Sequence, residues 1–194
     1  METEISKAKA GLRAKIRAAL EKISPAVRAV ESVGLCARLK LQMQSARTVL
    51  FFSPLPGELD VWPLLEEFLA AEKIAALPFF DADKKTYGAR RVEDLRTEIT
   101  AGKFGVREPV STCTEISIEK FDLLLVPGMA FDLQGHRLGR GKGFYDRLLA
   151  ETNGIKCGVG YDFQLLEKIP TGPHDAKVDF IFTPTRCLKT VKRI

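Results

Sequence analysis

The sequence contains no long apolar run. No stretch approaches the roughly 18 consecutive apolar residues of a membrane span, and the opening METEISKAKAGLRAK has no apolar segment typical of a signal sequence. Internal repeats, low-complexity tracts and linkers are absent as well. We therefore expect a soluble, cytoplasmic protein. Because 194 residues with 45% apolar content are enough for one buried core, residues 1–194 are predicted to form a single domain, which we expect to be monomeric.

Paired cysteines are also missing. The four cysteines lie far apart and include no CxxC pair: Cys36, Cys113, Cys157 and Cys187. This spacing matches neither a zinc site nor a small disulfide framework, so the sequence predicts buried free thiols.

Five short runs rich in apolar, β-branched and aromatic residues predict strands: TVLFF at 48, KIAALPFF at 73, FDLLLVPG at 121, IKCGVGYD at 155 and VDFIFTP at 178. They are continuously apolar rather than alternating. Strands covered by helices on both faces have this composition, so the pattern predicts an α/β fold with a mostly parallel sheet.

Helical patterns lie between these runs. Apolar residues recur every four positions from Ala8 to Leu20, and a second helix is predicted from Pro25 after a Ser24 N-cap. A third is predicted from Asp60, whose carboxylate can cap its first amides. The charged stretch 81–109 is irregular, and we expect a hairpin around KTYGARRV and a loop through KFGVREP.

The stretch RLGRGKGFYDR, residues 137–147, combines three glycines with four basic side chains. It follows the run FDLLLVPG and leads into a helix with an apolar face at Phe144, Tyr145, Leu148 and Leu149. A glycine-rich loop at a helix N-terminus is suited to binding phosphate. The stretch matches neither the Walker pattern, in which His136 would replace the first glycine, nor the GxGxxG pattern, in which Phe144 would replace the third.

Two interpretations of this loop stay open from the residues alone. It is either a phosphate site or a surface turn whose basic side chains are solvated. Asp146, in the first turn of the following helix, is placed either to hold Mg²⁺ against a bound phosphate or simply to stabilise the helix dipole.

The stretch VPGMAFDLQGHRLGRGKGFYDRLL, residues 126–149, resembles the signature of the 5-formyltetrahydrofolate cyclo-ligase family. Weaker similarity extends through KAKAGLRAKIR, SPLPGELDVWPLL, KFGVREP and PHDAKVDFIFTP. The resemblance implies a three-layer α/β/α fold similar to the ribose-phosphate isomerase and CoA-transferase group. It also implies an ATP-dependent, Mg²⁺-requiring conversion of 5-formyltetrahydrofolate to 5,10-methenyltetrahydrofolate, with release of ADP and phosphate.

The family's chemistry accounts for the composition of the loop. An N5-formyl oxygen is a poor leaving group, so the family transfers the γ-phosphoryl group of ATP to it before N10 closes the ring. The resemblance implies catalytic roles for Lys142 and Arg140. The implied ATP contacts are Lys9, Arg13, Arg137, Leu138, Gly139, Arg140, Gly141, Lys142, Gly143, Phe144 and Tyr145.

For folate, the implied contacts are Phe52, Glu58, Arg140, Lys142, Gly143 and Phe144, and for the metal they are Asp146 and Asp179. A carboxylate such as Glu58 can pair with the 2-amino and ring N–H donors of a pterin. Taken by themselves, Lys9 and Arg13 would be read as a solvated helix face and Phe52 as a core aromatic. His174 and Asp175 receive no role, and nothing is carried over for residues 84–100.

Two other functions are compatible with the sequence. Thirty basic against 25 acidic residues give a net charge of +5, which would also suit a nucleic-acid-binding module. The basic residues are scattered among acids, however, and no recognised nucleic-acid motif is present. The other alternative is an inactive relative that only binds folate, which the joint presence of Lys142, Asp146, Glu58 and Asp179 disfavours.

Overall fold

The computed structural model describes residues 2–82, 86–102, 106–172 and 175–191. Its helices are α1 (Glu2–Leu20), α2 (Pro25–Gln42), α3 (Trp62–Ala70) and α4 (Phe144–Ala150), with short 3-10 helices at Ile118–Lys120 and Asp162–Gln164. Its strands are β1 (Thr48–Leu50), β2 (Ile74–Asp81), β3 (Thr86–Val92), β4 (Ile99–Ala101), β5 (Arg107–Pro109), β6 (Glu115–Ile116), β7 (Leu123–Pro127), β8 (Ala130–Asp132), β9 (Arg137–Leu138), β10 (Ile155–Val159), β11 (Leu165–Leu166), β12 (Phe180–Phe182) and β13 (Cys187–Lys189).

The main sheet has eight strands in the order β13-β12-β10-β7-β1-β2-β3-β6. The five inner neighbours from β12 to β2 are parallel, whereas β13, β3 and β6 pair antiparallel at the two edges. All five predicted strands are among the parallel ones, which confirms the prediction of a mostly parallel sheet.

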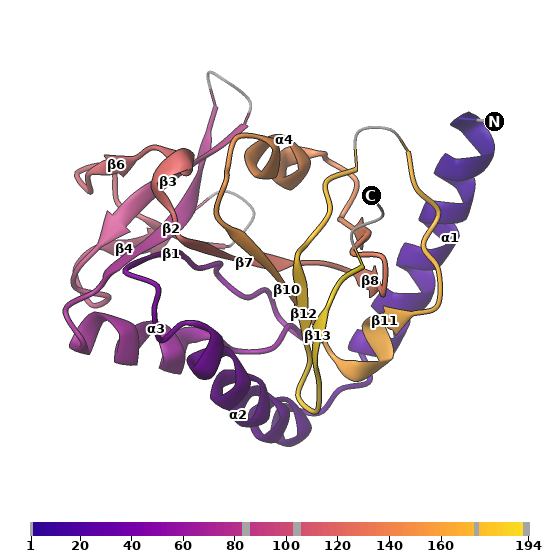
Figure 1. The fold of residues 1–194 in the computed structure, drawn as a ribbon, viewed down its shortest axis with the longest axis horizontal. Coiled ribbons are helices and arrows are strands. Elements are labelled where there is room, and N and C mark those ends of the chain that lie inside the picture. The colour runs from indigo at the N-terminus through magenta and orange to yellow at the C-terminus, as the bar shows by residue number, and fades with distance from the viewer. Residues whose placement is uncertain (1, 83–85, 103–105, 173–174, 192–194) are drawn as a thin grey trace.

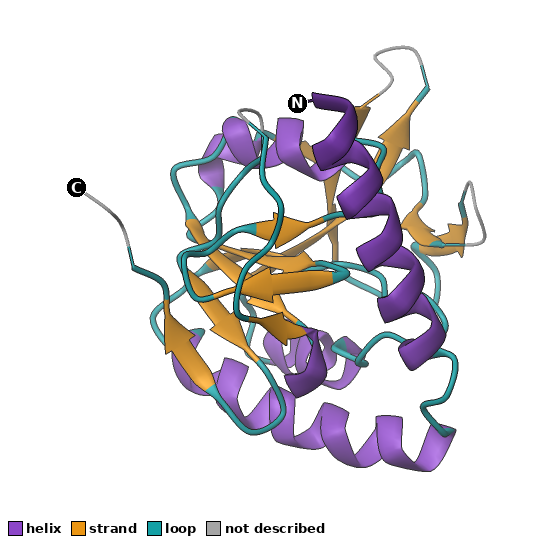
Figure 2. Ribbon diagram, turned by 90° about the vertical axis from the view of Figure 1, so that its right-hand side faces the viewer, coloured by secondary structure: helices purple, strands orange, loops and turns teal. Residues whose placement is uncertain are grey.

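The sheet lies between two layers of helices (Figure 1). On one side α2 and α3 pack on it, with α1 joining the same apolar core through Ile16 and Leu20. On the other side α4 contributes Leu148 and Leu149 to a second core. The view in Figure 2 shows the sheet between helices from a second direction. The expected three-layer α/β/α architecture is therefore confirmed.

The predicted helix starts are partly correct. Ser24 caps α2, since its hydroxyl accepts the Val27 amide at 3.3 Å. The third helix begins two residues later than predicted, at Trp62, because Asp60 and Val61 lie outside the helical backbone. The Asp60 carboxylate still accepts the Trp62 amide at 3.1 Å.

Two other expectations need correction. The hairpin around KTYGARRV is present as β2 and β3, but REP in KFGVREP forms strand β5, paired antiparallel with β4 rather than lying in a loop. The cysteines are free, as predicted, but only Cys113 and Cys157 are buried; Cys36 is half-buried and Cys187 is exposed. Within the described ranges, no helix combines the length and apolar character needed to cross a membrane.

Candidate active site

The predicted phosphate loop lies between β9 and α4, after the β8–β9 hairpin. Two of its glycines have backbone conformations that disfavour side chains: Gly141 has a φ of 98° and Gly143, the N-cap residue of α4, has a φ of 66°. A Cβ atom on Gly139 would lie 3.0 Å from Nη1 of Arg137. These glycines let the loop turn tightly beside an arginine and present its backbone to a ligand.

On one side of the loop is a cavity of about 880 Å³, here called the basic cavity. Its wall contains parts of α1, the loop, α4 and the segment before β12. It is lined by six basic and two acidic side chains: Lys9, Arg13, Arg137, Arg147, Lys156 and Lys177, with Asp146 and Asp175. This excess of positive charge suits a polyanionic ligand.

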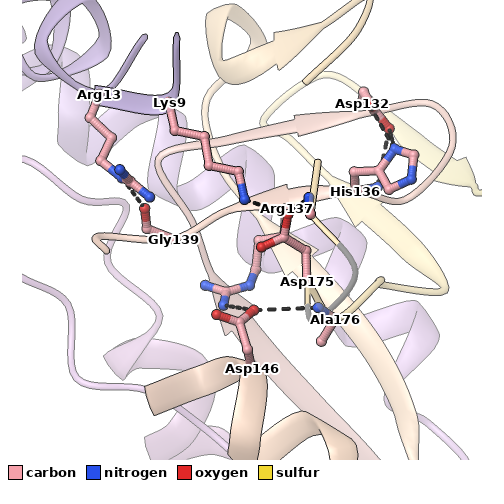
Figure 3. Close-up of polar contacts among 10 residues, drawn as sticks. Lys9, Arg13, Asp132, His136, Arg137, Gly139, Asp146, Asp175 and Ala176 are labelled. Carbon is pink, nitrogen blue, oxygen red and sulfur yellow. Dashed lines mark hydrogen bonds and ion pairs between the residues drawn. The ribbon is translucent and has the colours of Figure 1, made fainter. Parts of the chain in front are cut away.

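The helix α1 delivers its two predicted residues to this cavity (Figure 3). Arg13 Nε donates a hydrogen bond to the Gly139 carbonyl at 2.7 Å, and the Lys9 ammonium pairs with the Asp175 carboxylate. Burial would raise the pKa of the Asp175 carboxyl, but hydrogen bonds from Lys9 and from the Gly172 amide outweigh it and lower the pKa below its usual value. The carboxylate of Asp175 is thus kept ionised.

Arg137 lies behind the loop and is almost fully buried, at 4% exposed. Its Nη2 donates to Asp146 Oδ1 at 2.8 Å and its Nη1 donates to the Pro127 carbonyl at 3.2 Å. Its Nε is buried and has no hydrogen-bond partner within the part of the chain that the structure describes. A buried donor without a partner marks a place where a ligand oxygen would be favourable.

On the other side of the loop is a smaller cavity of about 140 Å³, here called the aromatic cavity. It lies beyond the carboxyl ends of β1 and β7, the usual ligand position in an open parallel sheet. The rings of Tyr87 and Tyr145 are 5.9 Å apart and both line it. Burial raises the pKa of each phenol, so both hydroxyls stay protonated and able to donate hydrogen bonds.

Glu58 closes the aromatic cavity from the β1 side. Its Oε1 accepts a 2.6 Å hydrogen bond from Nη2 of Arg140, and its Oε2 accepts the Leu55 amide at 2.9 Å. The loop therefore contacts the segment after β1 through an ion pair. Lys142 lines the same cavity.

The two cavities share a wall. Four residues line both of them: Arg137, Gly139, Gly143 and Asp146. Ligands in the two cavities would therefore meet across the glycine loop, beside the Arg137–Asp146 pair.

The predicted ATP contacts divide between the two sides. Those in the basic cavity are Lys9, Arg13, Arg137, Leu138, Gly139, Gly141 and Gly143. Arg140, Lys142 and Tyr145 line the aromatic cavity instead. The side chain of Phe144 lies outside the described residues, as do Lys103 to Gly105 and His174. Phe52 is 2% exposed and lies in the core, where it borders a small recess shared with Glu58.

Asp179 is not brought together with Asp146. Its Oδ2 accepts the Lys156 amide at 3.0 Å, and it lines a separate cavity with the residues around Gly154 and Thr190. The acid that does join Asp146 in the basic cavity is Asp175, whose neighbour Ala176 donates its amide to Asp146 Oδ1 at 3.4 Å.

The sequence prediction also missed Tyr87, Arg147, Lys156 and Lys177, which line the two cavities. In the sequence, Asp175 stands out only as a second acid four residues before Asp179, in PHDAKVD. The described residues contain no cluster of three or more His, Cys, Asp or Glu side chains suited to holding a metal by themselves.

Comparison with known proteins gives a consistent result. A model of the 5-formyltetrahydrofolate cyclo-ligase family matches residues 5–184. The 5-formyltetrahydrofolate cyclo-ligase of Mycolicibacterium smegmatis is 33% identical over 93% of this chain and 95% of its own. The corresponding enzyme of Escherichia coli K12 is 32% identical over 73% of this chain and 80% of its own.

Solved structures agree with these sequence matches. The NMR structure of a 5,10-methenyltetrahydrofolate synthetase from Aquifex aeolicus has a TM-score of 0.85 and 34% identity, covering 96% of this chain and 94% of that one. A Mycoplasma pneumoniae protein of the same name, at 21% identity, has a TM-score of 0.74 over 91% of this chain and 98% of its own, which supports the fold.

Proposed function

Because this chain belongs to the 5-formyltetrahydrofolate cyclo-ligase family, we propose that it converts 5-formyltetrahydrofolate to 5,10-methenyltetrahydrofolate and releases ADP and phosphate. The family uses ATP. We assign the triphosphate of ATP to the basic cavity, where six basic side chains surround the glycine loop. We assign the folate to the aromatic cavity, with Glu58 facing the pterin donors and the two tyrosines along the aromatic part of the substrate.

The reaction needs two steps at the formyl group. First the formyl oxygen attacks the γ-phosphorus, and the bond from that phosphorus to the β,γ-bridging oxygen breaks to release ADP. N10 then attacks the formyl carbon and loses its proton, and the carbon–oxygen bond breaks as phosphate leaves. The chain has to hold donor and acceptor in line and to neutralise the charge on the transferred group.

The shared wall of the two cavities supports this assignment more than any other observation. Arg137, Gly139, Gly143 and Asp146 line both sides, so a phosphoryl donor on one side and an acceptor on the other would meet there. Arg137 would supply positive charge from a buried position, and the backbone of the glycine loop would supply N–H donors. Arg140 and Lys142 would neutralise charge from the folate side.

Asp146 and Asp175 are proposed to hold Mg²⁺. Both carboxylates line the basic cavity, and Mg²⁺ is usually bound by one or two carboxylates together with substrate phosphates, so the two acids that the described residues place here fit this ion. When bound, the ion would neutralise phosphate charge. We propose Asp175 in place of Asp179, whose carboxylate lines a different cavity.

The experiment that tests this function is a methenyl absorbance assay with purified protein and 5-formyltetrahydrofolate. Product should form when ATP and Mg²⁺ are both supplied, and should not form when either is omitted. Binding of folate without turnover would instead identify an inactive folate-binding relative. Turnover without ATP would contradict the proposed phosphorylation.

A nucleic-acid-binding role is not favoured, because six basic side chains gather in one cavity beside the loop, where they suit a small polyanion. We also propose that the protein acts in the cytoplasm and that residues 1–194 form one catalytic domain.

A further inference from the structure

The carboxylate of Asp132, the last residue of β8, is completely buried and lines neither of the two cavities. Four N–H groups point at it. Its Oδ1 accepts the backbone amides of Gln134 at 3.0 Å and of His136 at 3.1 Å. Its Oδ2 accepts the Ile169 amide at 3.0 Å and lies 3.0 Å from Nδ1 of the His136 ring. A carboxylate can only accept hydrogen bonds, so the ring carries a proton on Nδ1.

The four donors explain why an acid occupies this buried position. An asparagine at position 132 could accept the Gln134 and His136 amides with its side-chain oxygen. Its amino group would then face the Ile169 amide and the His136 ring, so that buried donors would oppose one another. A buried charge is tolerated only when it is well hydrogen-bonded, and here each carboxylate oxygen has two donors. The Asp132 carboxylate therefore holds its four donors together in a way that a neutral side chain would not.

The first segment that Asp132 holds is the turn of residues 132–136, which leads directly into Arg137 on β9 (Figure 3). Within this turn Gly135 has a φ of 82°, and a Cβ atom there would lie 2.5 Å from the Val178 carbonyl oxygen. The turn thus packs closely against the segment before β12. Because the Arg137 side chain lines both cavities, the position of the turn determines where its guanidinium lies.

The second segment that Asp132 holds contributes to the wall of the basic cavity. The chain contacts the turn at Ile169, through the Asp132 carboxylate, and again at Val178, whose amide donates to the Gly135 carbonyl at 2.9 Å. Asp175 lies between these two points in the sequence and lines the basic cavity. One turn therefore fixes the chain on both sides of this acid.

We propose that Asp132 is a positioning residue for the nucleotide side of the site, an inference that rests on the proposed function. Asp132 acts through Arg137 and Asp175 and touches no ligand itself. A displacement of about 1 Å in such groups can lower the rate of a reaction by roughly 100-fold. The folate side should depend on Asp132 much less, because Glu58 follows β1 and Tyr87 belongs to β3, which lie outside the two segments.

Calorimetry of the full chain with ATP and Mg²⁺, and separately with 5-formyltetrahydrofolate, tests this proposal. Asp132→Asn should weaken ATP binding by roughly 10-fold, because charged contacts to the phosphates are displaced, while folate affinity stays within about twofold. In the methenyl assay its kcat should fall by up to roughly 100-fold and its KM for ATP should rise, with the KM for folate kept.

The matched control is Asp122→Asn. Asp122 also accepts two backbone amides, from Arg47 at 2.8 Å and from Thr48 at 2.9 Å, but it lies just before β7 and lines neither cavity. We expect thermal melts to show a lower Tm for Asp122→Asn and for Asp132→Asn. Only the change at Asp132 should alter ATP binding.

His136→Phe is a milder variant that decides the matter if Asp132→Asn does not fold. It keeps a ring but removes the Nδ1 donor, at a side chain that is 16% exposed. ATP affinity should fall by about 3-fold, again with folate affinity kept.

Equal weakening of ATP and folate binding would overturn the proposal, because Asp132 would then support the whole fold rather than one side of the site. ATP binding at the wild-type level in Asp132→Asn, or in His136→Phe if the first variant does not fold, would overturn it as well. A wild type that binds ATP but forms no product would contradict the proposed function alone, whereas a wild type that binds no ATP would contradict both.

Discussion

Arg137 and Asp146 form a 2.8 Å ion pair at the wall between the two cavities. The arginine side chain is 3% exposed and the aspartate side chain is 23% exposed. The guanidinium is therefore shielded from water, whereas the carboxylate that pairs with it is accessible from the cavity. A buried guanidinium is stable only if its N–H groups are hydrogen-bonded in the plane of the group. Asp146 and the Pro127 carbonyl accept two of these hydrogen bonds.

Arg137→Lys should therefore impair catalysis although it keeps the charge. Lysine has no planar fork to bond Asp146 and the Pro127 carbonyl together, so we expect turnover to fall by roughly 100-fold or more. Arg147→Lys is the matched control, because Arg147 is an exposed residue of the same basic cavity, and its loss should be much smaller. Equal rates for the two variants in the methenyl assay would remove Arg137 from the proposed role.

The three aspartates near the basic cavity should respond differently to Mg²⁺. Asp146→Asn and Asp175→Asn each remove one charge from the proposed site, so both should need more Mg²⁺ for half-maximal turnover. Asp179→Asn should leave this requirement unchanged, because its carboxylate lines a different cavity. Mg²⁺ titrations of turnover measure the effect. A raised requirement for Asp146→Asn and Asp179→Asn, with Asp175→Asn unchanged, would restore the pair predicted from the sequence.

Two variants distinguish the contribution of charge in the glycine loop from the contribution of its backbone conformation. Lys142→Met removes a cation from the folate side, so turnover should fall by roughly 100- to 1,000-fold while ATP binding is largely kept. Gly141→Val forces a branched side chain onto a φ of 98°, so ATP affinity should fall as well. Calorimetry of ATP binding, turnover and thermal melts distinguish these outcomes. If both variants behave like the wild type, the loop is an ordinary surface turn.

The Lys9–Asp175 pair should make stability depend on acidity. The pKa of Asp175 is lowered in the folded protein, so its contribution is present above the ordinary pKa of about 3.9 and is lost as the pH falls through the lower native value. Asp175→Asn should lower Tm by roughly 2–4 °C at neutral pH, for a loss of about 1 kcal/mol. The difference from the wild type should shrink below about pH 4. A difference that stays constant down to strong acidity would contradict this account.

Local features of the fold could be predicted from the sequence because they depend on neighbouring residues. Continuous apolar runs predicted the five parallel strands, and Ser24 before Pro25 predicted the start of α2. The glycines around Lys142 predicted a loop at the start of a helix, and Gly141 and Gly143 do lie in such a loop, with positive φ angles. In each case the signal lies within a few residues of the structure that it determines.

Positions that depend on distant segments were decided by the tertiary structure. Asp175 and Asp179 are four residues apart, and the sequence alone does not distinguish them. Where β12 begins beside β10, the Asp179 carboxylate accepts the Lys156 amide. The preceding segment instead lies against the basic cavity, because the Ala176 amide donates to Asp146. Asp175 therefore contacts Lys9 of α1, although the two residues are 166 positions apart in the sequence. Likewise Tyr87 reaches the site because β3 folds back on β2. Such contacts arise from the packing of whole elements, which no local pattern of residues encodes.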